Sequence, residues 1–396
     1  MLNKTSSITF KVCFAFLVIF APQVFAQVGG ATSSTSINWV SDDGTYSLKP
    51  QLRIQFRGSS PFDSEPTSLE GFEQPSKNSL EINRARLKLT GHTYYSWLKY
   101  NIQYELASNR LIDFDVRIER SKELSLKLGQ WKAEYSRERS ISSGGQQMMD
   151  RSIINRVFTI DRQQGISLYG QVDAGGAANF NYWTGVFNGS GRGGSSNDDN
   201  HFMYSGRVEW NPFGKAVGFK SSDLTYSEEP VLSLGLAIAD HQSRYTRFSS
   251  SGGGSLEGFN VGDAGQFKIS QHTLDAALMY KGFSGQAEYH EKVIKDTFNN
   301  NAEVNYEGFY VQAGYFLHSI FEWWPDNLEL ATRYAEYETD LNNVNNVFDE
   351  ASLALNLFLN KHKNKVTFQV SELSASINQN EQVDRTRYQI QWDFSF

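Results

Sequence analysis

Long apolar runs are missing from this 396-residue chain beyond its first 26 residues. A transmembrane helix needs about 18 or more consecutive apolar residues, so helical membrane spans are excluded from residue 27 onward. Cysteine is almost absent as well, since Cys13 is the only one. We expect Cys13 to be removed with a signal peptide, which would leave a mature chain without disulfides or thiolate metal sites.

An excess of positive charge is missing too. The chain has 37 Lys and Arg residues against 44 Asp and Glu residues, a formal net charge of −7. Removing Lys4 and Lys11 with the signal peptide leaves 35 − 44 = −9. We therefore expect no nucleic-acid partner, because such partners favour basic patches. The sequence also lacks motifs for nucleophilic catalysis, phosphate-binding loops and zinc ligation, so we expect neither an enzyme nor a cofactor.

The first segment has the features of a secretory signal. Two lysines precede the short apolar run VCFAFLVIFA, and Val24-Phe25-Ala26 ends in a small residue suited to cleavage. About ten apolar residues are too few to span a bilayer. We expect a signal peptide at 1–26, a short periplasmic segment at 27–45 and one membrane domain at 46–396.

Alternation of apolar and polar residues is the dominant pattern in the rest of the chain. In the terminal stretch RTRYQIQWDFSF, Tyr388, Ile390, Trp392, Phe394 and Phe396 share one face and polar residues share the other. Similar segments recur with strongly charged polar faces, which would cost several kcal/mol, on the order of buried-ion penalties, in a dry core. With 14% aromatic residues, the pattern predicts an antiparallel transmembrane β-barrel with a lipid-facing apolar surface and a wet lumen.

Sixteen strands are predicted. Their approximate ranges are 46–57, 80–91, 94–106, 111–120, 124–131, 164–173, 178–188, 202–211, 231–240, 272–282, 283–294, 306–318, 327–338, 350–360, 364–376 and 385–396. Long and short connections alternate, as expected for outside loops and periplasmic turns. Residues 212–230 are an exception, a long turn on the short-turn side. An even number of strands lets the last strand pair with the first and leaves no open edge.

Cations concentrate on one predicted wall of the lumen. Arg84, Arg86 and Lys88 share the polar face of 80–91, and the neighbouring strand adds Lys49, Arg53 and Arg57. Guanidinium groups match phosphate and carboxylate oxygens, so the wall would attract anions. The alternative is that these cations pair with nearby carboxylates.

The segment 131–162 is the second candidate region. It carries basic residues, including Arg137, together with apolar residues such as Met148 and Ile153. A loop this long with apolar side chains is expected to fold into the barrel and narrow the lumen. The alternative is an ordered external loop whose cations pair with its own acidic residues.

At this point the chain resembles the phosphate-selective porin O and P family from about residue 45 onward. The stretches that carry the resemblance are INRARLKLTGHTYYSWLKYNIQYELAS (82–108), LKLGQWKAEYSRERSISSGGQQMMDRS (126–152), GFSGQAEYHEKVIK (282–295), YEGFYVQAGYFL (306–317) and the terminal Phe396. The resemblance implies a sixteen-stranded, homotrimeric barrel in the outer membrane of a Gram-negative bacterium. It also implies a third external loop folded into the pore, and a terminal strand read by the outer-membrane insertion machinery.

Binding residues are carried over one by one from the resemblance. The positions that match the family pattern at the pore constriction are Arg84, Asp113, Arg139, Ser142, Ser143 and Arg151. Two cations of the family pattern are replaced, by Gln51 and Asn83, which weakens the expectation of tight phosphate selectivity. Arg53 and Arg86 are candidates to compensate.

The function favoured by these observations is passive, anion-preferring diffusion of small solutes, most of all phosphate or a related oxyanion, through an outer-membrane porin. Alternatives are a general or differently selective porin, and a surface-exposed structural or adhesive barrel without transport. A soluble sandwich is the remaining structural alternative.

Overall fold

The computed structural model describes residues 37–61, 71–72, 76–194, 196–249, 253–341, 344–377 and 381–396. The expected signal peptide at 1–26 and the first part of the expected periplasmic segment lie outside the described residues. No helix in the described ranges is both long and apolar enough to cross a bilayer.

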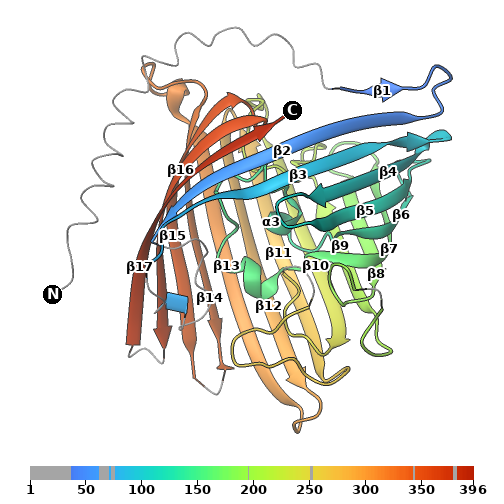
Figure 1. Ribbon diagram of the computed structural model, residues 1–396. Coiled ribbons are helices and arrows are strands. Elements are labelled where there is room, and N and C mark those ends of the chain that lie inside the picture. Colours follow the sequence, from blue (N-terminus) through green and yellow to red (C-terminus); the bar gives the residue numbers. More distant parts are fainter. Residues whose placement is uncertain are drawn as a thin grey trace. The chain divides into compact units, whose positions relative to one another are not determined.

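The described strands form a closed antiparallel barrel (Figure 1). The sheet has seventeen strands, of which β1 is a short addition paired with β2 and the other sixteen close the ring, with β17 paired to β2. The strands are β1 (Trp39–Val40), β2 (Ser47–Ser60), β3 (Ser79–Thr93), β4 (Tyr95–Glu105), β5 (Arg110–Ile118), β6 (Ser125–Lys132), β7 (Arg162–Asp173), β8 (Asn179–Phe187), β9 (Met203–Trp210), β10 (Val231–Ser243), β11 (Phe267–Tyr280), β12 (Phe283–Asp296), β13 (Ala302–Phe316), β14 (Leu328–Thr339), β15 (Asn346–Asn360), β16 (Asn364–Ile377) and β17 (Glu381–Ser395). All sixteen predicted barrel strands are therefore confirmed, with β11 beginning five residues earlier than expected.

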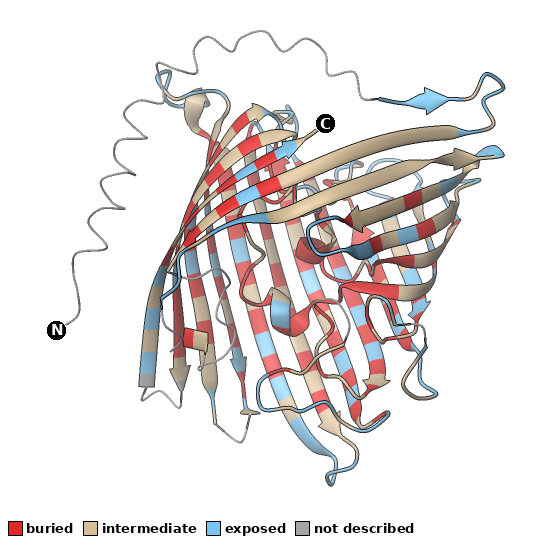
Figure 2. Ribbon diagram, in the orientation of Figure 1, coloured by how far each residue is buried: buried red, intermediate tan, exposed pale blue. Residues whose placement is uncertain are grey.

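Each strand of the barrel has two different faces. On β17, Trp392 and Phe394 are 45% and 36% exposed, whereas Arg387 and Asp393 on alternate positions are 1% exposed. Figure 2 shows the same alternation of buried and exposed residues along the other strands. The exposed face is apolar and suits lipid, while the buried face points into the barrel. The predicted two-sided pattern is confirmed, and a soluble sandwich is excluded by ring closure.

The long connection between β6 and β7, residues 133–161, lies inside the barrel. It contains two short helices, α3 (Arg137–Ser140) and α4 (Asn155–Phe158). Side chains from the wall donate to its backbone: Lys365 Nζ to the Gln146 carbonyl at 2.7 Å, and Lys292 Nζ to the Val157 carbonyl at 2.9 Å. These bonds satisfy backbone groups that a buried loop would otherwise leave unpaired. The structure therefore has the predicted inward fold of this connection, which we call the inner loop.

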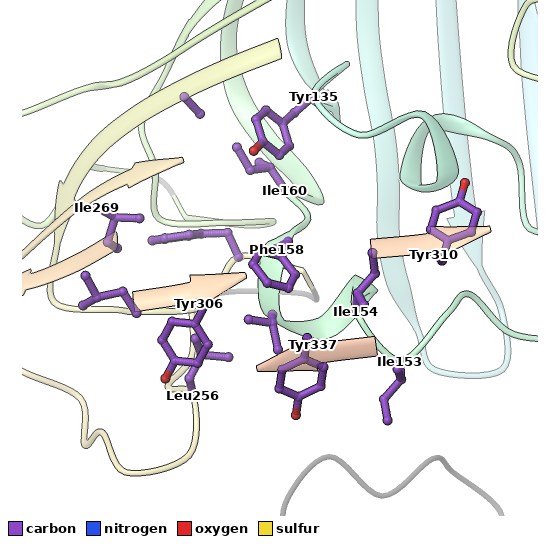
Figure 3. Packing of buried hydrophobic residues seen from close by; sticks show 14 of the residues in the cluster. Tyr135, Ile153, Ile154, Phe158, Ile160, Leu256, Ile269, Tyr306, Tyr310 and Tyr337 are labelled. Carbon is purple, nitrogen blue, oxygen red and sulfur yellow. The ribbon is translucent and has the colours of Figure 1, made fainter. Parts of the chain in front are cut away.

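The interior of the barrel is not polar throughout, and the prediction of a wholly wet lumen is wrong at this point. Figure 3 shows a buried apolar cluster that joins the inner loop to lumen-facing residues of the wall. Phe158 of the inner loop stacks on His290 at 5.3 Å between ring centroids and meets Tyr337 edge-on. The inner loop buries its apolar side chains here, because lumen-facing positions such as Tyr310 are also apolar.

The exceptional connection between β9 and β10 also folds inward. Within residues 211–230, the Lys220 carbonyl accepts from Arg137 Nη2 at 2.9 Å, and Ser222 Oγ donates to Glu329 Oε2 at 3.0 Å. Ser222 is 3% exposed. This segment is long for a turn because it enters the barrel from the short-turn end and meets the inner loop. We call it the lower segment.

Replacing Phe158 with Ala is expected to loosen the inner loop without opening the barrel. A buried Phe→Ala change costs about 3–5 kcal/mol, and here the lost contacts fasten the loop rather than the strands. We expect limited trypsin digestion to cleave within 133–161 faster than in the wild type, while heat-induced loss of strand structure stays at the same temperature. Phe213→Ala, at a 58% exposed position, is the matched control. Equal cleavage of both variants would contradict this account of the loop's anchor.

Candidate functional site

The cationic wall is formed by register between β2 and β3. Arg53 lies directly opposite Arg86, and the lumen-facing pairs on either side bring Arg84 and Lys88 to the same strip. Side chains directly opposite on one face of an antiparallel pair lie close together, and like charges in this position repel. The strands supply part of the partnering, since Arg84 donates to Gln55 on β2 and Arg86 pairs with Glu105 on β4, whereas Arg53 and Lys88 have no carboxylate partner among the described strand residues.

The tip of the inner loop supplies hydroxyl groups to this strip. Arg53 donates to Ser142 Oγ at 3.2 Å and to Ser143 Oγ at 2.6 Å, and Arg86 donates to Ser143 Oγ at 3.1 Å. Gly144 allows this approach, because a Cβ at that position would lie 2.4 Å from Arg53 Nη1. The loop tip and the β2–β3 wall thus meet at a narrow point, which we call the constriction.

Five cations around the constriction have no ion pair with a described carboxylate. They are Arg53, Arg84, Lys88, Lys132 and Arg151, and we call them the cationic cluster. Arg84 donates to Gln55 Oε1 at 2.7 Å, and Arg151 donates to the Ile141 carbonyl at 2.8 Å. Lys132 Nζ also donates to the Ile141 carbonyl, at 3.0 Å. Neutral acceptors hold Arg84, Arg151 and Lys132, so none of these three cations is spent in a direct ion pair.

Two of the predicted binding residues are engaged elsewhere. Arg139 is 9% exposed and forms an ion pair with Asp161, another residue of the inner loop, at 2.7 Å. Asp113 forms an ion pair with Arg162 at 2.8 Å rather than with Arg84 or Arg151. The structure brings together Arg84, Arg151, Ser142 and Ser143 with Arg53, and places Arg139 and Asp113 in the framework around them.

Three predicted pore-lining cations also have distinct positions. Arg57 is 5% exposed and pairs with Asp150 at 2.9 Å. Arg137 is fully buried and donates a hydrogen bond to the lower segment. Neither Arg57 nor Arg137 therefore lines open space. The prediction that they line the pore fails because Asp150 of the inner loop covers Arg57, and Arg137 packs between the inner loop and the lower segment. Lys49 is half-buried near the start of β2, on the same face as Arg53.

The carboxylates of the cationic wall are neutralised locally. Glu105 pairs with Arg86 at 2.6 Å, and Asp115 pairs with Arg117 at 2.8 Å. Pairing with nearby carboxylates, the alternative suggested by the sequence, therefore applies to Arg57 and Arg86 but not to the cationic cluster.

A further cation near the constriction was missed from the sequence. Arg192 lies in the connection between β8 and β9, which was not predicted to be part of a site. The neighbouring Gly191 and Gly193 amides donate to lumen-facing Gln163 and Gln130 at 3.0 and 2.8 Å. Arg192 consequently lies within electrostatic reach of Arg162 and Arg86. No local sequence pattern predicts this position of Arg192, because the two glutamines that bind the loop backbone are far from it in the sequence.

The inner loop leans toward one side of the barrel. Its hydrogen bonds run mainly to strands β12 to β17, where lumen-facing residues such as Glu329 and Glu350 are fully buried. On β3, which lies next to β2 beyond β17 in the ring, Arg84, Arg86 and Lys88 are half-buried. Among the described residues, the inner loop meets this wall only through Ser142 and Ser143 at Arg53 and Arg86, through the Ser143 carbonyl at Gln55, and through Asp150 and Met149 at Arg57.

Asp150 fixes the end of the loop tip next to Arg151. Its carboxylate accepts from Arg57 Nη1 at 2.9 and 3.0 Å and lies 3.4 Å from Arg387 Nη2. Burial alone would raise the pKa of Asp150, but the guanidinium groups of Arg57 and Arg387 outweigh it and hold the pKa below its usual range. The Asp150 carboxylate therefore stays charged at neutral pH.

The side chains at the constriction are mainly hydrogen-bond donors and hydroxyls. Among the described residues, no group of three or more His, Cys, Asp or Glu side chains is placed to hold a metal ion. The constriction offers guanidinium and ammonium donors with two hydroxyls, which together can replace part of an anion's hydration shell.

Comparison with known proteins agrees with this geometry. The chain resembles solved structures of an anion-selective porin from Comamonas acidovorans (12% identity, 89% of this chain and 100% of that chain, TM-score 0.58) and of the outer membrane channel DcaP of Acinetobacter baumannii (11%, 90% and 99%, 0.57). A third is OmpT of Vibrio cholerae (8%, 90% and 100%, 0.54). At these identities the likeness shows the fold. No curated protein sequence matched the chain. The family model for phosphate-selective porin O and P matches residues 63–396, and the chain belongs to that family.

Proposed function

We propose that this protein is a passive outer-membrane pore that prefers small anions, with phosphate or a related oxyanion as the favoured solute. The observation that carries the proposal is the cationic cluster, whose members form no ion pair with a described carboxylate, and in which Arg53 donates to Ser142 and Ser143. Family membership supports the phosphate preference. The anion-selective porin of Comamonas acidovorans supports the anion preference through a shared fold.

Transport proceeds by attraction, transient binding and release. The positive charge of the cationic cluster raises the local anion concentration, and the low-dielectric wall focuses its field. At the constriction an anion accepts from Arg53 and Arg84 while Ser143 supplies a hydroxyl. Arg53 already donates to Ser143, so each passage exchanges one hydrogen bond for another and binding stays weak enough for exit.

The same proposal includes the orientation of the barrel in the membrane, its insertion and its assembly. The long loops face outward and the short turns face the periplasm of a Gram-negative bacterium, after cleavage of the signal peptide at 1–26. The terminal aromatic strand β17 is read by the insertion machinery. The protein assembles as a homotrimer; OmpT of Vibrio cholerae, which shares the fold, has been solved in a trimer form.

Planar-bilayer recording tests the proposed solute. In a chloride gradient the wild type should show an anion-selective reversal potential, and added phosphate should block chloride current in a saturable way. Replacing Arg84 and Arg151 with Ala should abolish the phosphate block, because both donors lose their charge and reach. Arg120→Ala, in the exposed short turn between β5 and β6, is the control. A cation-selective wild type would overturn the anion preference, and a phosphate block that survives in the double variant would overturn the site.

A differently selective pore is the second candidate. It is favoured by the neutral residues Gln51 and Asn83, which stand where the family pattern has cations. Competition of chloride current by phosphate, pyrophosphate, arsenate and small organic anions separates the two candidates. A surface barrel without transport would show no solute flux in liposome swelling.

A further inference from the structure

A second cavity lies inside the barrel, away from the constriction. It has a volume of about 320 Å³ and lies at the end that carries the long loops. Strands β13 to β15 form its floor, α4 of the inner loop forms one side, and residues 255–259 of the loop between β10 and β11 form the roof. A volume near the lower end of the roughly 300–1,000 Å³ range of small-molecule sites suits a ligand of one ring.

The floor is built from two cross-strand rows. Tyr306, Thr339 and Asn346 form the outer row, and Tyr337 pairs with Phe348 in the next row. The rings of Tyr337 and Phe348 stack with 4.7 Å between centroids and an interplanar angle of 10°. In Figure 3 the hydroxyl ends of Tyr306 and Tyr337 point away from Phe158 at the centre of the apolar cluster. The floor therefore offers flat apolar surface edged by phenol groups.

Polar groups around this floor are left without partners. Asn346 Oδ1 and Ser255 Oγ, which both line the cavity, are buried and make no hydrogen bond with the described residues. Buried polar atoms are nearly always paired, so an unpaired acceptor facing a cavity points to a ligand that donates. The rim also carries one cation, Arg156, and one anion, Glu257. The rim charges balance, so no net charge is required of the ligand.

From these features we infer that the cavity binds a carbohydrate of hexose size. A pyranose ring has one flat face of C–H groups that suits the aromatic floor. Its hydroxyls can donate to Asn346 Oδ1 and Glu257, and they can accept from Arg156. Inorganic phosphate has no apolar face and would leave the floor uncovered. The inference goes beyond the proposed anion passage and uses none of the residues of the constriction.

Ligand-observed NMR with the purified full-length protein in detergent tests the inference. Saturation transfer should reach the ring protons of D-glucose or D-galactose in a saturable, millimolar titration. D-sorbitol is the matched ligand control, since it has the hydroxyls but no ring face, and it should show no saturable transfer. Inorganic phosphate should not displace the bound hexose.

Two Asn→Leu variants locate the site. Asn346→Leu removes the unpaired acceptor and should weaken hexose binding by roughly fivefold to tenfold, the value of one hydrogen bond. Asn345→Leu changes the neighbouring exposed residue, whose side chain bonds Glu338 instead, and should leave binding unchanged. Arg84→Ala should alter the phosphate block of current but not hexose binding.

Each contrary result overturns the inference. These results are no saturable transfer to either hexose, equal transfer to sorbitol, equal weakening by both leucine variants, and loss of hexose binding in Arg84→Ala. If hexose binding fails while phosphate still blocks the current, the hexose site is overturned and the proposed anion function stands. If hexose binds but phosphate does not block the current, the proposed anion function is overturned and the hexose site stands.

Discussion

Replacing Arg53 and Lys88 together with Gln is expected to remove most of the pore's preference for chloride over potassium. Both cations lie on the half-buried strip of β2 and β3, and neither pairs with a described carboxylate. Even in water, a unit charge 4 Å from an ion contributes about 1 kcal/mol, and more beside a low-dielectric wall. Losing two such charges should lower the anion-to-cation permeability ratio by roughly tenfold or more, read from the reversal potential in a potassium chloride gradient.

The control for this variant removes the same charge elsewhere. Lys122 and Lys361 are exposed residues in turns at the short-turn end of the barrel. Changing both to Gln should shift the reversal potential only slightly, because at 0.15 M salt exposed charges are screened within about 8 Å. The glutamines at 53 and 88 keep a donor and much of the side-chain length, which limits disturbance of the loop tip. If both double variants kept wild-type selectivity, the cationic cluster would not be the selectivity filter.

Replacing Asp150 with Ala is expected to have the largest effect on the pore's size. The change leaves Arg57 and Arg387, which are 5% and 1% exposed, without their shared carboxylate. Breaking a buried ion pair by removing one partner costs about 3–5 kcal/mol. The strain falls on the loop tip rather than on the closed sheet, so the tip should leave the β2–β3 wall. Single-channel recordings should then show larger, fluctuating conductance and no phosphate block.

A conservative variant and a pH series sharpen this test. Asp150→Asn keeps an acceptor and should give an intermediate conductance. Because the folded-state pKa of Asp150 is held below its usual range, its stabilising contribution is present above the unfolded pKa and is lost only as the pH falls through the lowered value. Wild-type recordings at pH 7 and pH 5 should therefore agree in conductance. Two results would contradict the role of Asp150 in holding the loop tip. One is a wild-type channel that, at pH 5, has the conductance of Asp150→Ala. The other is an Asp150→Ala variant with unchanged conductance.

The barrel was predictable because its physics is local. Alternation along β17 and along the other strands identifies each strand separately, and the lipid-facing side needs no knowledge of its partners. The inward fold of residues 133–161 was also predictable, since a long loop with residues such as Met148 and Ile153 must bury them somewhere. The order of strands then follows from their sequence order.

The pairing of individual cations could not be predicted, because it depends on which wall the inner loop touches. From the sequence, Arg57 and Arg53 look equivalent, four residues apart on one face of β2. In the structure, Asp150 covers Arg57, while Ser143 meets Arg53, which forms no ion pair with a described carboxylate. The apolar cluster around Phe158 was missed for the same reason, since its partners Tyr310 and Tyr337 come from two different strands. Long-range packing decided both points.

The one-sided seat of the inner loop and the lower segment has a practical consequence for engineering. On the proposed path, permeating solutes meet a narrow band of neighbouring strands, while strands β12 to β17 support the inner loop through hydrogen bonds. A mutational library meant to retune solute choice can therefore be restricted to the inward positions of β2 to β7 and the loop tip. The other half of the ring can be stabilised or redesigned independently, for example to build a tougher nanopore with unchanged permeability.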